Sequence, residues 1–399
     1  MINEATQRFI ALHREDDVSR LALRGCKDPA VSMAVALEQI AGWQTARRKL
    51  PSWAATEGLV FPPHLALEQC SSEATARYKA AVVARLLGGR GQRLLDLTGG
   101  FGVDFSFLSS CFDEAVYVER QQALCQVARH NFDLLGIRAQ VVCADGADAL
   151  QQQPPCTLIF MDPARRDAHG GRTYGIGDCT PNVLQLLPQL QQQSVWLMLK
   201  LSPMLDWRKA VADVGRSHVR QVHIVSVGGE CKELLLVLSS AASEAPLRLV
   251  CVNNDDVFEV ENAAEAAHDA PVAAVPTLAP GLFLYEPNAS IMKAGCFAQL
   301  AQRCGVVQLA RDSHLFVAPE LIDSFPGRRF RVCGTSSMNK KEVRRLLAMV
   351  SQANVSVRHF PLGADQLRSR LKLSEGGSNY LFATTLATGD HVLILCEKA

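Results

Sequence analysis

The sequence predicts an α/β protein in which helices cover both faces of a mainly parallel sheet of seven strands. Short apolar runs alternate with helical patterns from residue 93 to about residue 240, as in parallel sheets. A glycine-rich stretch, Gly99-Gly100-Phe101-Gly102, follows the first run, and several runs end in an acid. Ligands of open α/β sheets bind beyond the carboxyl ends of the strands, so these residues mark the predicted site.

The predicted strands follow one another in a regular order. Only a few residues around Gly228-Gly229 separate the last two strands, and this link is too short for a parallel crossover. The last two strands are therefore expected to be antiparallel. The seven strands are expected at 93–98, 115–119, 139–144, 157–161, 195–201, 221–227 and 233–239, and the helices near 103–110, 121–135, 181–192 and 207–214.

Further segments flank this central region. Apolar residues at helical spacing predict a helical amino-terminal subdomain, in which Ser71 or Ser72 caps a helix. A hairpin is expected at 245–260, before an alanine- and proline-rich passage at 262–280. The predicted domains are helical residues 1–90, the central domain 91–240, a hairpin and linker 241–281, a small unit 282–326 and an α/β domain 327–399.

The last of these domains shows its own alternation of strands and helices. A helix is expected at 339–351, with an apolar stripe that leaves Lys340, Lys341 and Arg344 on its other faces. A shorter helix is expected at 364–371. Strands are expected at 328–333, 355–360, 380–386 and 392–396, the last two as a hairpin.

Composition excludes several classes of protein. A hydrophobic content of 48% with 20% charged residues is typical of a globular protein. The thirteen cysteines are dispersed without a Cys-x-x-Cys pair or zinc-type spacing, which indicates reduced thiols and no metal site. No signal peptide and no apolar run of about 20 residues is found. The sequence therefore predicts a cytoplasmic protein without a membrane partner.

The net charge of +1 hides an uneven distribution. Residues 327–399 contain 12 Lys and Arg against 5 Asp and Glu, an excess of seven positive charges. Such a basic region can bind polyanions, or it can simply be a solvated surface. Charge alone does not choose between these two interpretations.

Three acids at strand ends indicate which ligand the glycine loop binds. Glu119 ends the second strand, where a carboxylate can accept both hydroxyls of a ribose. Asp145 follows the third strand and can accept from an exocyclic amine, and Asp96 lies beside the glycines. A dinucleotide site would also use Glu119, but its loop needs a further glycine where Phe105 stands. Acids beside the glycines also suit a cationic ligand better than a pyrophosphate.

This combination resembles the class I S-adenosylmethionine-dependent methyltransferases. The resemblance implies a Rossmann-like, seven-stranded sheet with S-adenosyl-L-methionine as cofactor. It places Glu119 on the ribose-binding acid, Asp145 on the adenine-binding position, and Asp162-Pro163 on the fourth-strand motif beside the transferred methyl group. The residues expected to bind the cofactor are Asp96, Thr98, Gly100, Gly102, Asp104, Glu119, Asp145 and Gly146.

The fourth-strand motif, Asp162-Pro163-Ala164-Arg165, departs from the Asp/Asn-Pro-Pro-aromatic motif of the base-amino methyltransferases that it resembles. In those enzymes the carboxylate accepts from the target amine and the aromatic ring stacks on a flipped base. Asp162, Pro163 and Arg165 are the expected catalytic residues. Arg165 can stack on a base or bind a phosphate, or it can pair with Asp167. No cysteine stands in the motif, so a covalent cytosine mechanism has no support.

Several other residues are weaker candidates. Arg166 and Tyr174 are expected to contact substrate, Tyr174 from a glycine-rich loop at 170–177. Lys200 follows the fifth strand, where a surface charge is the favoured interpretation over a catalytic role. Tyr78 and Lys79 could reach the pocket from the helical region.

The whole chain is similar to a bacterial group of methyltransferases that carry a small ferredoxin-like unit and a THUMP-like carboxy-terminal domain. THUMP domains in other enzymes present structured RNA, usually tRNA, to a catalytic neighbour. The resemblance rests on Tyr285-Glu286-Pro287-Asn288, Phe360-Pro361-Leu362, Leu371-Lys372-Leu373 and Gly376-Gly377 before Tyr380-Leu381-Phe382-Ala383-Thr384.

The resemblance implies methyl transfer to RNA, either tRNA or rRNA, with a base nitrogen as the expected acceptor. Lys340, Lys341 and Arg344 are expected to contact this RNA. Transfer from a sulfonium to a neutral nitrogen needs alignment more than strong base catalysis. Two rival functions remain open: a methyltransferase of a small molecule or protein, and an RNA-binding protein whose methyltransferase fold is inactive.

Overall fold

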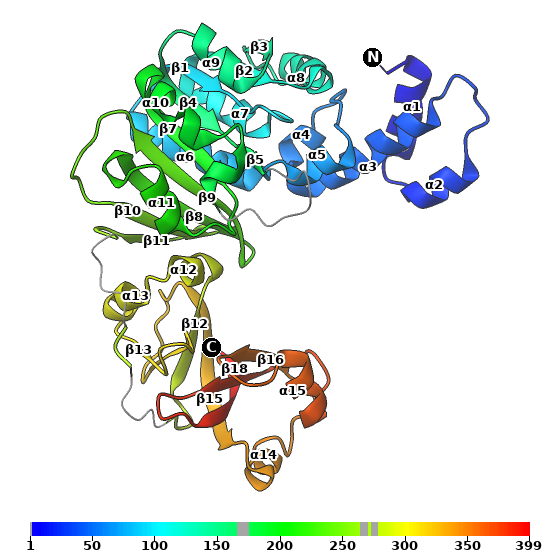
Figure 1. Ribbon diagram of the computed structural model, residues 1–399. Helices are drawn as coiled ribbons and strands as arrows, with labels where there is room; N and C mark the ends of the chain where they lie inside the picture. Colours follow the sequence, from blue (N-terminus) through cyan, green and yellow to red (C-terminus); the bar gives the residue numbers. More distant parts are fainter. Residues whose placement is uncertain (1, 166–174, 264–269, 273–277) are drawn as a thin grey trace. The chain divides into compact units, whose positions relative to one another are not determined.

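The computed structural model describes residues 2–165, 175–263, 270–272 and 278–399 (Figure 1). The chain forms two compact units. One comprises Met1–Gln221 and Glu233–Ala245, and the other comprises Val222–Lys232 and Pro246–Ala399.

The first unit begins with a group of helices, drawn in blue in Figure 1. Phe9, Leu21 and Ile40 form one small buried core, and a second core around Trp53 and Phe101 joins the later helices to the loop after the first strand. Ser72, one of the two serines expected to cap a helix, accepts from the backbone N–H of Thr75 at 3.2 Å. The helices are α1 Glu4–His13, α2 Val18–Arg24, α3 Met33–Lys49, α4 Pro51–Ala54, α5 His64–Gln69 and α6 Glu73–Leu87.

A large sheet follows in the order β11-β10-β8-β9-β7-β4-β1-β2-β3. Strands β1 to β4 and β7 pair in parallel, because helices connect them, whereas β9 runs antiparallel to β7. The strands are β1 Gly91–Asp96, β2 Phe112–Glu119, β3 Gln140–Cys143, β4 Cys156–Met161, β7 Ser194–Leu201, β8 Val219–Val227, β9 Glu230–Ser239, β10 Arg248–Asn253 and β11 Asp256–Val260.

The predicted α/β fold is confirmed, but the sheet has nine strands instead of seven. The expected hairpin at 245–260 forms as the antiparallel pair β10–β11, and it extends the sheet because β10 lies beside β8. The connecting helices are α7 Val103–Leu108, α8 Gln122–Leu134, α9 Gly146–Gln152, α10 Val183–Gln193 and α11 Trp207–Asp213, with short turns η1 Ser109–Cys111, η2 Ile176–Asp178 and η3 Arg216–His218. A separate two-stranded sheet joins β5 Ala164–Arg165 to β6 Cys179–Thr180.

A second sheet, of seven strands, occupies the carboxy-terminal part in the order β13-β14-β12-β15-β18-β17-β16. The expected carboxy-terminal hairpin forms as the antiparallel pair β17–β18. The strands are β12 Phe283–Pro287, β13 Val307–Gln308, β14 Phe316–Ala318, β15 Gly327–Ser337, β16 Asn354–Arg358, β17 Asn379–Thr385 and β18 His391–Lys398, and the helices are α12 Ala289–Ala294, α13 Phe297–Cys304, α14 Lys340–Leu346 and α15 Ala364–Leu371.

Both faces of this second sheet are covered. Phe382 and Ile394 belong to one buried cluster with Phe330, while their neighbours Leu381 and Leu393 belong to another. Side chains alternate between the two faces of a strand, so this alternation places a core on each side of the sheet.

Helix α14 is shorter than the sequence predicts, since it ends at Leu346 and not near residue 351. Ser374 donates to the carbonyl of Ser351 at 2.9 Å, and Ala353 donates to the carbonyl of Ser374 at 3.0 Å. The chain is extended there, and an extended segment cannot continue a helix. The predicted apolar stripe is nevertheless present, because Val343, Leu346, Leu347 and Val350 pack against the core.

The buried carboxylate of Glu286 joins strands that lie far apart in the order of the second sheet. Oε1 accepts from Arg358 of β16 at 2.7 Å, and Oε2 accepts from Arg328 of β15 at 2.6 Å. Three strands separate β12 from β16 in the sheet. The sheet must therefore curl for its edge strand to reach Glu286.

Parts of the predicted linker at 262–280 fall on 264–269 and 273–277, which lie outside the described residues. Val272 forms a bridge with Gln308 of β13. Within the described ranges, no helix is long and apolar enough to cross a membrane.

Candidate active site

The loop after β1 is built around glycines that its surroundings require. A Cβ atom at Gly99 would lie 2.2 Å from the ring of Tyr117, which is buried in β2. Gly100 and Gly102 have φ angles of +56° and +86°, a conformation that side chains rarely adopt. The loop therefore turns sharply against the sheet and leaves its main chain at the edge where the strands end.

Glu119, at the end of β2, holds this loop in place. Its Oε2 accepts from the N–H of Gly100 at 3.0 Å, and its Oε1 accepts from the N–H of Gln121 at 2.8 Å. Each carboxylate oxygen has a second lone pair. Both oxygens can therefore still accept a hydroxyl.

The end of β3 lies directly beside these residues. Ala144 donates its N–H to the carbonyl of Glu119 at 3.1 Å, and a Cβ atom at Gly146 would lie 2.3 Å from the carbonyl oxygen of Leu97. Asp145 caps α9 through the N–H of Ala147 at 2.9 Å and is exposed. The ends of β1, β2 and β3 thus meet at one edge.

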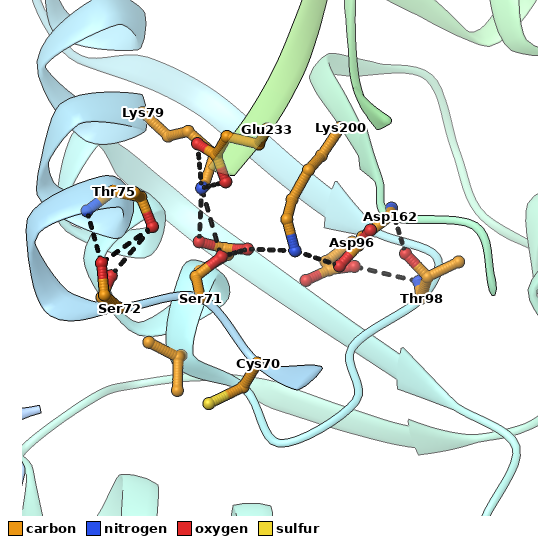
Figure 2. A network of polar contacts seen from close by, with 12 residues as sticks. Cys70, Ser71, Ser72, Thr75, Lys79, Asp96, Thr98, Asp162, Lys200 and Glu233 are labelled. Carbon is orange, nitrogen blue, oxygen red and sulfur yellow. Dashed lines mark hydrogen bonds and ion pairs between the residues drawn. The ribbon is translucent and has the colours of Figure 1, made fainter. Parts of the chain in front are cut away.

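The end of β4 joins the same edge through Thr98. The hydroxyl of Thr98 accepts from the N–H of Asp162 at 2.6 Å, and its own N–H donates to Asp96 at 2.9 Å. The fourth-strand motif therefore lies against the glycine loop, as the sequence predicts (Figure 2).

Asp96 is fully buried beneath this loop. Burial raises the pKa of its carboxyl well above the usual value, although the hydrogen bond from Thr98 acts in the opposite direction. The carboxylates of Asp104, Asp162 and Glu119 raise it further. The neighbouring carboxylates thus make the local electrostatic field at Asp96 negative, and a negative field favours a cationic ligand.

Lys200 contacts Asp162 directly, which overturns its interpretation as a surface charge. Its side chain is only 12% exposed, and its ammonium donates to Oδ2 of Asp162. Lys200 belongs to β7, which pairs with β4, so the register of the sheet brings the two strand ends together.

Behind Lys200 lies a buried network that the sequence did not reveal (Figure 2). Asp104 of α7 lies 3.8 Å from the ammonium of Lys200 and 3.1 Å from that of Lys79. Lys79 is fully buried in α6 and donates to both oxygens of Glu233 in β9 at 2.7 Å. Ser71 donates to Asp104 at 2.7 Å. Every ammonium in this network has a carboxylate beside it, as burial of charge requires.

The pKa values of the network reflect burial and the paired charges. Burial alone would raise the pKa of Asp104, but the ammonium groups of Lys79 and Lys200 lower it. For Glu233, burial prevails over Lys79 and raises the pKa of the carboxyl. Burial would lower the pKa of Lys200, yet Asp162 and the other carboxylates raise it above the usual lysine range. Lys200 is therefore a cation at neutral pH.

Comparison with known proteins identifies the protein family. Residues 327–398 match a family model described as THUMP domain-like, and residues 283–326 match one described as a ferredoxin-like domain. A solved structure from Porphyromonas gingivalis W83, named a "putative methyltransferase", is 32% identical, covers 100% of both chains and has a TM-score of 0.85.

The chain belongs to this family of class I S-adenosylmethionine-dependent methyltransferases. An uncharacterized S-adenosylmethionine-dependent methyltransferase of Mycobacterium tuberculosis H37Rv is 24% identical over 311 residues, 77% of this chain and 80% of the relative. The resemblance noted from the sequence is confirmed. The protein is an enzyme, and S-adenosylmethionine is its cofactor.

The residues at the strand ends fit this cofactor. The methyltransferase has a glycine loop with its main chain at the sheet edge, a carboxylate with free lone pairs at the end of β2 and buried acids beneath. These are the groups that a ribose and a sulfonium require. The assignments of Asp96, Thr98, Gly100, Gly102, Glu119, Asp145 and Gly146 to the cofactor stay predictions, and their positions agree with one site.

The remaining predicted residues differ in their surroundings. The carboxylate of Asp104 is directed to Lys79, Lys200 and Ser71, so its predicted contact with the cofactor has to compete with three partners. Pro163 is buried, and the backbone of Arg165 lies in β5, paired with Cys179. Arg166, Asp167 and Tyr174 lie outside the described residues. Lys340, Lys341 and Arg344 are exposed on α14 in the second unit.

One signal in the sequence could have identified the network. Lys200 interrupts the apolar run of β7, and Glu233 opens that of β9. A charge within a buried run needs a partner of opposite sign. Within the described residues, no group of His, Cys, Asp and Glu has an arrangement suited to a metal ion.

Proposed function

We propose that this methyltransferase acts on a base nitrogen of a structured RNA, either tRNA or rRNA. The observation that carries the proposal is the hydrogen bond between Thr98 and Asp162, which puts the Asp-Pro motif against the glycine loop. A carboxylate in that position can accept from an amino group and aim its nitrogen.

The chemistry required of the chain is alignment. When bound, S-adenosylmethionine supplies an electrophilic methyl group. Transfer of that methyl group to the acceptor nitrogen would leave the carbon–sulfur electron pair on sulfur, and the nitrogen would release its proton to solvent. Asp162 holds the amino group in line, and Pro163 shapes the motif. Arg165 and Arg166 are the residues predicted from the sequence to bind a base or a phosphate through a guanidinium group.

Support for RNA as the substrate comes from the carboxy-terminal region. Residues 327–398 match the THUMP-like model, and residues 327–399 carry the excess of seven positive charges. Lys340, Lys341 and Arg344 are exposed on α14, where they can bind phosphates.

Tritiated-methyl transfer to RNA from a strain that lacks the gene tests this proposal. We expect wild-type protein to label this RNA and Asp162→Ala to label it at least a hundredfold more slowly, with unchanged affinity for the cofactor. Equal labelling by both proteins would show that Asp162 has no such role.

The rival functions give different results in the same assay. Label that enters a protein or small-molecule fraction but not RNA would identify another substrate class. RNA binding and cofactor binding without any transfer would identify an inactive methyltransferase fold.

A further inference from the structure

Asp162 is fixed by contacts at both its main chain and its side chain. Its backbone N–H donates a hydrogen bond to the hydroxyl of Thr98, and its Oδ2 accepts one from the ammonium of Lys200. Within the described residues, Oδ1 accepts no hydrogen bond, and the side chain is 39% exposed. One oxygen is thus occupied by an ammonium, and the other can receive a ligand.

We infer that Lys200 is a positioning residue for methyl transfer: its ammonium holds one oxygen of Asp162 so that the other is presented to the acceptor's amino group. This inference rests on the proposed function, in which Asp162 aims the acceptor. Without the ammonium, the carboxylate could rotate about its side-chain bonds, and the alignment of the nitrogen would be lost.

The buried network explains why Lys200 keeps this position. Asp104 lies 3.8 Å from the ammonium of Lys200 and is itself held by Lys79 and Ser71. Lys79 and Glu233 are less than 4% exposed, so water does not compete for this pair. The ammonium of Lys200 therefore has two carboxylates close to it, Asp162 after β4 and Asp104 in α7.

The same surroundings exclude a role for Lys200 as a base. A general base must be able to lose its proton near the working pH, whereas the pKa of Lys200 is raised. Lys200 therefore does not take the proton released by the acceptor. Among the residues that the structure describes, the titratable groups around Lys200 and Asp162 are Asp96 from β1, Asp104 from α7, Lys79 from α6, Glu233 from β9 and Cys70 after α5.

Steady-state kinetics with Lys200→Met and Lys200→Arg test the inference. We expect Lys200→Met to lower kcat for RNA about 10- to 100-fold, while calorimetry shows cofactor affinity within about twofold of wild type. Lys200→Arg should recover part of kcat, because a guanidinium can also hold the carboxylate. Lys209→Met is the matched control, since Lys209 is 60% exposed on α11 and, in the described part of the chain, its ammonium pairs only with its helix neighbour Asp213.

A second measurement requires no turnover. In lysine-labelled protein, the ammonium of Lys200 is followed by NMR as the pH rises, and its signal is assigned by its loss in Lys200→Met. We expect Asp162→Asn to lower the pKa of Lys200, because Asp162 is the carboxylate that raises it most.

Two results would overturn the inference: an unchanged kcat in Lys200→Met, or the same Lys200 titration in wild type and Asp162→Asn. Failure of the wild-type protein to methylate any RNA would overturn the proposed function instead. The titration would then decide by itself whether Asp162 and Lys200 act as a pair.

Discussion

Burial is the main cause of the raised pKa of Asp96. The carboxyl lies under the glycine loop with 1% of its surface exposed, and burial raises its pKa above the value in the unfolded chain. The folded protein therefore retains this proton to higher pH. The contribution of Asp96 to stability consequently falls as the pH rises from the unfolded-state pKa through the folded-state pKa.

We expect Asp96→Asn to raise the melting temperature of the cofactor-free enzyme at neutral pH. The amide cannot ionise and can still accept from Thr98, so the cost of burying a group that is ionised in the unfolded chain is removed. It should also weaken cofactor binding roughly tenfold, because a cationic ligand favours the ionised form of Asp96 and a lost interaction with a charged group costs about 1.5 kcal/mol or more. Thermal melts between pH 4 and pH 8, with calorimetry at pH 7, check both effects.

The difference in melting temperature between Asp96→Asn and wild type should grow with pH. Neighbouring acids titrate in both proteins, so this difference isolates Asp96. A difference that does not vary with pH would show that burial leaves the proton affinity of Asp96 unchanged.

At the scale of elements, the carboxy-terminal sheet depends on one acid. Glu286 accepts from an arginine on β15 and from another on β16, and its side chain is 4% exposed. The neighbours of Glu286 in its motif are also structural. The hydroxyl of Tyr285 donates to the carbonyl of Glu320 and accepts from the N–H of Ile322, and Asn288 caps α12. The Tyr-Glu-Pro-Asn motif is thus explained by the packing of this sheet.

We expect Glu286→Gln to destabilise the carboxy-terminal region by about 1.5–3 kcal/mol, the range for hydrogen bonds to charged groups. The two arginines are 36% and 53% exposed, so solvent limits the cost. Hydrogen exchange of the backbone amides of β12 and β15, recorded as the full chain is unfolded with denaturant, measures this loss of stability.

The control is Glu397→Gln, which removes an ion pair between Glu397 of β18 and Arg331 of β15. Both of these side chains are at least half exposed. This change should cost less than about 1 kcal/mol. Equal costs for the two variants would contradict the special role of Glu286.

At the scale of the whole molecule, the residues predicted to bind the cofactor and those predicted to bind RNA differ in charge. The acids of the active site lie in the first unit, and the basic excess lies in residues 327–399. Each phosphate that binds a lysine or arginine releases counterions, so affinity for RNA should fall steeply with salt.

We expect the triple change of Lys340, Lys341 and Arg344 to Gln to weaken RNA binding and reduce the salt slope by about 2–3. Cofactor affinity should stay the same. The matched control changes three exposed arginines of the amino-terminal helices, Arg8, Arg20 and Arg24. Fluorescence anisotropy with a tRNA at several salt concentrations compares the two triple variants. An equal effect of both would count against α14 as the RNA-binding surface.

Sequence reasoning predicted the strand ends because the relevant signals are local. An apolar run that closes on an acid, as at Glu119, gives both a strand and its functional end. The parallel order then requires these ends to lie at one edge, as the hydrogen bond from Ala144 to Glu119 bears out. Helix α14 shows where local signals fail. Its helical pattern continues to residue 351, but the hydrogen bond from Ser374 to Ser351 keeps the last residues out of the helix.

The sequence by itself determined the α/β fold, the glycine loop and the acids at the ends of the first four predicted strands, since periodicity and turn chemistry act between near neighbours. Only the tertiary structure decided that Lys200 is half of an ion pair and that Lys79, Asp104 and Glu233 stand behind it. These residues are separated by up to 154 positions. Charges so far apart in the chain meet only when strand order and register are set, and no local pattern encodes that meeting.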